Sequence, residues 1–165
     1  MRLLRRRPVP DPVRAVTLPA GEHRVAWALT TDGLPVVATD RGLRLPDRAL
    51  LPWEGIERAS FAQPVLTLTE LALVEGSGAR HALELDLDGV TDLPEVVRTR
   101  VAASVAWSSH LRLVPAGGVR IVGRRQPGLE VLDWQLVFDR DTDPHDAGLR
   151  AQAEQHLEAA RRTVG

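Results

Sequence analysis

One short segment near the C-terminus gathers the side chains best suited to bind a metal ion. They are Asp139, Asp141, Asp143, His145 and Asp146. Alternate acids resemble the start of a calcium-binding loop, which needs Gly at its sixth position and Glu at its twelfth. The chain has Pro144 and Arg150 at those positions. We therefore interpret the segment as the acidic start of a helix, and we expect no metal site and no cofactor.

Three arginines on or directly after a predicted strand are candidate binding residues. Arg120 and Arg124 share one face of this strand, because side chains two residues apart point the same way. They could accept an anion or pair with an acid such as Asp133 on the next strand. Arg125 directly follows them and completes the group.

The N-terminal residues form a second group of basic side chains. Arg5, Arg6 and Arg7 could contact an anionic lipid surface. Four prolines between positions 8 and 19 favour extended backbone that seldom packs, so residues 1–20 are expected to be a mobile arm. Because no apolar segment follows the arginines, we expect no secretory signal and a cytoplasmic protein.

The composition excludes several classes of function. The chain has 165 residues, a formal net charge of -1 and no cysteine, which excludes disulfides and thiolate zinc sites. The near-neutral charge argues against a specific nucleic-acid partner. No apolar run approaches the roughly 20 residues that span a bilayer. All 21 basic residues are Arg, a bias typical of a high-GC bacterial genome.

No catalytic motif is present in the sequence. It contains no Gly-x-Ser-x-Gly nucleophile elbow, phosphate-binding loop or dinucleotide fingerprint. The five histidines show no metal-ligand spacing. We therefore expect the protein not to be an enzyme.

The first two thirds of the chain reads as short strands followed by one helix. Alternating apolar residues and turn signals predict strands over 24–30, 35–39, 43–45, 49–53, 56–61, 65–71 and 82–87. The apolar period then changes to that of a helix, from about Leu93 to Trp107, with Asp92 and Glu95 at capping-box spacing. Its apolar stripe needs a sheet to cover.

A second β section and a final helix complete the chain. Strands are predicted over 111–114, 119–124 and 131–138, and a helix from Asp143 to about Arg162. The expected organisation is an arm over 1–20, a first unit over 21–108, and an extension over 109–165 that packs on it.

The order of these pieces resembles a known family. The motifs are T-D-R-G-L-R-L at 39–45, P-W-E-G-I at 52–56, and the helix start at 93–104. They are similar to bacterial pleckstrin-homology-like proteins of actinobacteria. The resemblance covers about residues 20–108 and implies an α+β fold: an antiparallel β-barrel or sandwich closed by one amphipathic helix, with a β-hairpin-plus-helix extension. Basic residues that bind inositol phosphates in this family are missing from the loop at 30–34.

The resemblance implies a scaffold used mainly for binding. We hypothesise a non-enzymatic protein-interaction module with a protein partner, and Trp53 is a candidate contact because it opens a strand beside the barrel end. An edge strand of the second β section could also pair across a homodimer. The alternatives are an adaptor on an anionic lipid surface, using the N-terminal arginines, and a binder of a small hydrophobic ligand.

Overall fold

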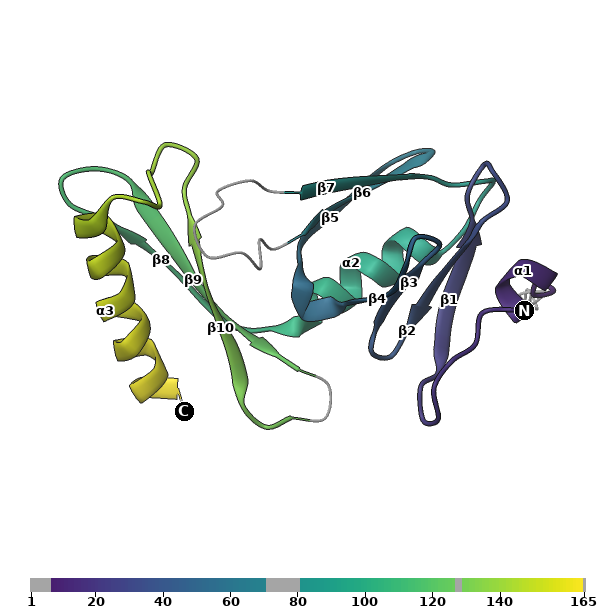
Figure 1. Cartoon of the computed structure of the whole chain (residues 1–165), viewed down its shortest axis with the longest axis horizontal. Helices are drawn as coiled ribbons and strands as arrows, with labels where there is room; N and C mark the ends of the chain where they lie inside the picture. The colour runs from purple at the N-terminus through teal and green to yellow at the C-terminus, as the bar shows by residue number, and fades with distance from the viewer. Residues whose placement is uncertain (1–6, 71–80, 127–128, 165) are drawn as a thin grey trace, which may run out of the picture.

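The described residues fold into three antiparallel sheets and three α-helices (Figure 1). This computed structural model describes residues 7–70, 81–126 and 129–164. The elements are α1 (Asp11–Arg14), β1 (Arg24–Leu29), β2 (Pro35–Thr39), β3 (Gly42–Leu45), β4 (Arg48–Pro52), the 3₁₀ turn η1 (Trp53–Gly55), β5 (Ile56–Ala62), β6 (Val65–Glu70), β7 (His81–Asp86), α2 (Leu93–Ser104), β8 (Val105–Arg112), β9 (Gly118–Arg125), β10 (Leu132–Phe138) and α3 (Ala147–Val164).

The first two sheets hold four and three strands, in the orders β1-β2-β3-β4 and β5-β6-β7. A bridge between Thr30 and Leu87 links them at one corner, and the Asp88 N–H donates to the Leu29 carbonyl oxygen at 2.8 Å. The predicted α+β class with antiparallel strands is confirmed. The finer prediction of a barrel or sandwich is not confirmed: strands β1–β7 lie in two separate sheets, and no closed barrel is found among the described residues.

Helix α2 packs between these two sheets and completes their shared core. Leu93 and Val97 are fully buried, together with inward-facing residues of β1–β3 and β5–β7. The expected cap from Asp92 is not formed; the hydroxyl oxygen of Thr91 accepts the Leu93 N–H instead, at 3.2 Å. The helix ends at Ser104, three residues before the predicted end, because residue 105 already begins β8.

Strand β1 turns its small residues inward. Ala26 and Ala28 are buried in the core, whereas Trp27 lies half-buried on the opposite face. The segment from residue 7 onward packs over that face, and Val13 of α1 is fully buried there. This part of the N-terminus therefore differs from the unpacked arm that its prolines predict.

The third sheet, called the C-terminal sheet below, has the order β10-β9-β8 and carries α3 on one face (Figure 1). Leu149 and Ala153 of α3 share a core with Val119 of β9. The helix begins four residues later than predicted, because the Asp146 carboxylate accepts the N–H groups of Gly148 and Leu149, each at 2.9 Å. Strand β8 also begins six residues earlier than predicted.

Candidate interaction surface

The C-terminal sheet has two chemically different faces. Register and alternation define a helix face, which packs against α3, and a polar face. The helix face carries Trp107, Ser109, Leu111, Val119, Ile121, Gly123, Leu132, Trp134, Leu136 and Phe138. The polar face carries Ser108, His110, Arg120, Val122, Arg124, Asp133, Gln135 and Val137.

One end of the polar face is exposed to solvent. Arg120 is exposed and lies opposite His110 in the register. His110 Nε2 lies 2.9 and 3.1 Å from the two carboxylate oxygens of Asp139. Gly118 makes this contact possible, because a Cβ built there would lie 2.3 Å from Asp139 Oδ2. The predicted position of Arg120 and Arg124 on one face is thus correct, but only Arg120 is accessible.

The other end of the polar face packs against the first two sheets through Arg124. This side chain is only 3% exposed. Its guanidinium donates to Ser104 Oγ at 2.7 Å, to Gln135 Oε1 at 3.2 Å and to the Glu57 carbonyl oxygen at 3.4 Å. Burial lowers the pKa of Arg124, while the negative charges of Glu57 and Asp133 act in the opposite direction. Arg124 thus connects the C-terminal sheet to α2 and β5 through hydrogen bonds.

The remaining predicted arginines do not join this cluster. Arg125 is exposed, and alternation places it on the opposite face of β9 from Arg124. Arg7 donates a hydrogen bond to the Val90 carbonyl oxygen, whereas Arg5 and Arg6 lie outside the described residues. The arginines predicted to bind a ligand are therefore not assembled into one anion site within the described chain.

Trp53 is part of the core. Its side chain is 3% exposed, and its indole Nε1–H donates to the Thr39 carbonyl oxygen at 3.1 Å. The 3₁₀ turn that contains it directs the ring inward between β2 and α2. The prediction that Trp53 contacts a partner is corrected, because its ring is not accessible to one.

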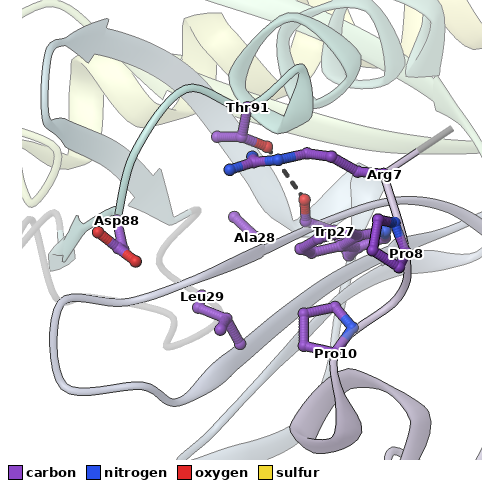
Figure 2. A pocket seen from close by; sticks show the side chains of 8 residues that line it. All are labelled: Arg7, Pro8, Pro10, Trp27, Ala28, Leu29, Asp88 and Thr91. Carbon is purple, nitrogen blue, oxygen red and sulfur yellow. Dashed lines mark hydrogen bonds between the residues drawn. The ribbon is translucent and has the colours of Figure 1, made fainter. Parts of the chain in front are cut away.

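A small pocket lies where the N-terminal segment crosses β1 (Figure 2). Figure 2 shows Pro8, Pro10 and Trp27 on one side of it and Asp88 and Thr91 on the other. The Thr91 hydroxyl donates to the Trp27 carbonyl oxygen at 3.0 Å, which closes the outer edge of β1. The volume of about 210 Å³ is below the roughly 300 Å³ at which ligand pockets begin. The pocket is therefore smaller than a typical site for a small-molecule ligand.

An aromatic pair occupies the helix face of the C-terminal sheet. The ring centroids of Trp107 and Trp134 lie 5.5 Å apart, with the ring planes tilted by 59°, a favourable aromatic geometry. Gly123 lies between them in the register, and a Cβ built there would approach the Trp134 ring to 3.2 Å. Both tryptophans are only half-buried, so α3 leaves part of this aromatic surface accessible.

Strand β10 is the edge of the C-terminal sheet beside this aromatic pair. All seven of its residues are half-buried. Residues 132–137 pair with β9, and no strand lies on their other side within the described ranges. Val131, just before the strand, is 69% exposed. An open, largely apolar edge is a template for pairing with another strand. The alternation over 131–138 predicted the strand, but it does not show which strand lies at an edge.

Within the described ranges, no group of three or more His, Cys, Asp or Glu is placed to hold a metal ion, and no helix is long and apolar enough to cross a membrane. The chain matches no protein-family model, no curated protein and no solved structure.

Proposed function

We propose that this protein is a non-enzymatic protein-interaction module on a pleckstrin-homology-like scaffold, and that β10 is its binding edge. The arrangement of four strands, three strands and one helix over residues 24–104 supports the scaffold. The observation that carries the function is the open edge of β10, with the half-buried Trp134 and Leu136 beside it.

The proposed mode of binding is the addition of an extended strand to this edge. Backbone N–H and C=O groups of β10 supply the hydrogen bonds, and the side chains on each face select the partner. Tryptophan is the residue type that most often dominates binding energy in such interfaces. Trp134 is therefore the expected anchor, and its ring already rests on Gly123 and Trp107 before a partner arrives.

Three other edges of the described structure, those of β1, β4 and β7, are less suited to this role. The outer edge of β1 is closed by contacts from Leu87, Asp88 and Thr91. Strand β4 has only five residues and ends in Pro52, which lacks a backbone N–H. Strand β7 carries the charged and exposed Glu84. These are the devices that keep edge strands from pairing.

Site-specific photocrosslinking tests the proposal. A photoreactive amino acid replaces Trp134, and in a control protein it replaces Glu84 on the edge strand β7. In a lysate of the native host, position 134 should yield an adduct of one defined mass that position 84 does not. The purified partner should bind the wild-type chain and lose about 30-fold in affinity with Trp134→Ala, but not with Glu84→Ala. The absence of an adduct specific to position 134 would refute the proposal.

A further inference from the structure

The residues that flank β10 have a charge pattern that matches itself, which points to a partner of identical sequence. We infer that two copies of this chain pair through β10 in an antiparallel, two-fold symmetric arrangement centred on Gln135. This inference rests on the proposed function, because it names the partner of the same edge. It would join two three-stranded C-terminal sheets into one six-stranded sheet with both α3 helices on the same side.

The first argument is that the outer backbone groups of residues 132–137 are available to a partner strand. Residues 132–137 pair with β9 on one side, and no described residue pairs with their backbone on the other side. A two-fold axis perpendicular to the sheet brings two such edges together, antiparallel and with the same face up. The polar groups of each edge then satisfy those of the other.

The second argument is the apolar row on the helix face. Trp134 and Leu136 belong to this row, and both are half-buried because they lie at the sheet edge. Pairing about Gln135 places Trp134 opposite Leu136 of the partner subunit, and the reverse. A directly opposed aromatic and aliphatic pair on one face stabilises antiparallel strands, so the row would become continuous across the dimer.

The third argument is the charge pattern, which selects this register. Side chains alternate between the two faces of a strand. Two opposed residues therefore lie on the same face only when both have even numbers or both have odd numbers. With Gln135 at the centre, Glu130, which precedes the strand, would face Arg140 of the partner subunit, which follows it, at both ends of the interface. Both side chains are exposed. A shift of the centre to Leu136 would instead place Asp133 opposite Asp139, a repulsive pair of like charges.

A shift of the centre to Trp134 is also disfavoured. It would place Asp133 opposite Gln135 and Glu130 opposite an aromatic side chain, Phe138 of the partner subunit, and would lose both attractive ion pairs. The register centred on Gln135 thus alone combines opposite charges at both ends with apolar contacts between them. Because the edge is short compared with the 20–30 residues per side of a standard interface, the dimer should be weak and depend on concentration.

Sedimentation velocity of the full chain, from about 1 μM to about 1 mM, is the direct test. The wild-type chain should convert from monomer to dimer over this range. Glu130→Arg or Arg140→Glu should each weaken the dimer about tenfold, because each change creates two like-charge pairs. The double variant Glu130→Arg/Arg140→Glu should restore it. Arg120→Glu is the matched control, since Arg120 is exposed on the polar face of β9.

Hydrogen exchange locates the interface independently of charge. The amides of residues 132–137 should exchange more slowly as concentration rises, while the edge strand β7 should not change. A chain that stays monomeric at the highest concentration refutes the inference, as does a dimer unaffected by the charge variants. The chain could instead stay monomeric and form a specific adduct with a different protein at position 134. This result would refute the homodimer but would still support the interaction module.

Discussion

The two hydrophobic cores of this chain differ in how completely its own residues cover them. The first lies between two sheets and α2, and its central residues, such as Leu68 and Ile56, are fully buried. The second lies between one sheet and one helix, where Val119 and Ala153 are buried but every residue of β10 is only half-buried. A helix is narrower than a three-stranded sheet, so one helix leaves the sheet's edge strand partly uncovered.

This difference separates the residues that stabilise the fold from those available for binding. In the first unit most of the described large apolar side chains are buried in the core. In the C-terminal sheet part of the apolar surface remains for a partner, at the expense of stability in the free chain. If this contrast holds, substitutions in the two cores should change stability by unequal amounts.

Truncation of one leucine in each core should give unequal losses of stability. Leu68→Ala should lower the free energy of unfolding by about 4 kcal/mol, because Leu68 is fully buried. Leu136→Ala should lower it by about 1 kcal/mol, because Leu136 is half-buried at the sheet edge. Urea denaturation at low micromolar concentration measures both values without a contribution from dimers. Equal losses would contradict the contrast between the cores.

A buried ion pair on the first sheet should give the next largest effect. The Arg44 guanidinium donates to both carboxylate oxygens of Glu22, at 2.9 and 2.6 Å, and the Glu22 side chain is 1% exposed. These hydrogen bonds lower the pKa of Glu22, against the raising effect of burial. Glu22→Gln should therefore lower the free energy of unfolding at pH 7 by about 3 kcal/mol.

The pH dependence of this loss follows from the sign of the pKa shift. Because the folded-state pKa of Glu22 lies below its ordinary value of 4.5, the ion pair stabilises the fold above about that pH, and this stability is lost as the pH falls. The difference between wild type and Glu22→Gln should thus shrink in acid, as followed by thermal unfolding from pH 7 to pH 3. Glu95→Gln is the control, since the pair of Glu95 with Arg98 is exposed and should contribute less than about 1 kcal/mol.

The junction between the two cores should give an intermediate effect. Arg124→Met removes three donors that hold the C-terminal sheet against the first unit, and leaves Gln135 Oε1 and the Glu57 carbonyl oxygen to find other partners. We expect a loss of about 2 kcal/mol, with faster hydrogen exchange confined to β8–β10. The exposed Arg125→Met should change neither quantity. An unfolding curve that stays unchanged in Arg124→Met would show that the junction does not couple the two cores.

Much of this fold could be predicted from the sequence, because alternation and turn residues act locally. Strand β2 was predicted with the observed bounds, Pro35–Thr39. Strand β8 was missed over its first six residues, 105–110, because it continues directly from α2 without a Gly or Pro between Ser104 and Trp107. The N-terminal helix was missed because a fully buried Val13, not local propensity, holds that segment on the sheet.

The accessible residues of the candidate site could not be predicted from the alternation of side chains along a strand. The pattern placed Arg120 and Arg124 on one face of a strand, but it could not show that α2 and β5 would bury one and leave the other exposed. Alternation over 24–30 likewise does not show that the face with Ala26 and Ala28 is the one that meets the core. Burial and edge position arise from how sheets meet, and these contacts join residues far apart in the sequence.

The smallest expected effect concerns the exposed end of the polar face. Gly118→Ala would bring a Cβ to within 2.9 Å of His110 Nε2 and still closer to Asp139. Both are ends of flexible side chains, so they should separate and leave the backbone in place. The exposed His110–Asp139 pair contributes little, and the expected loss is about 0.5 kcal/mol, measured by urea denaturation. A loss above about 2 kcal/mol would instead mean that the polar face carries as much stability as the helix face, and the β10 edge would then be a weaker candidate for binding.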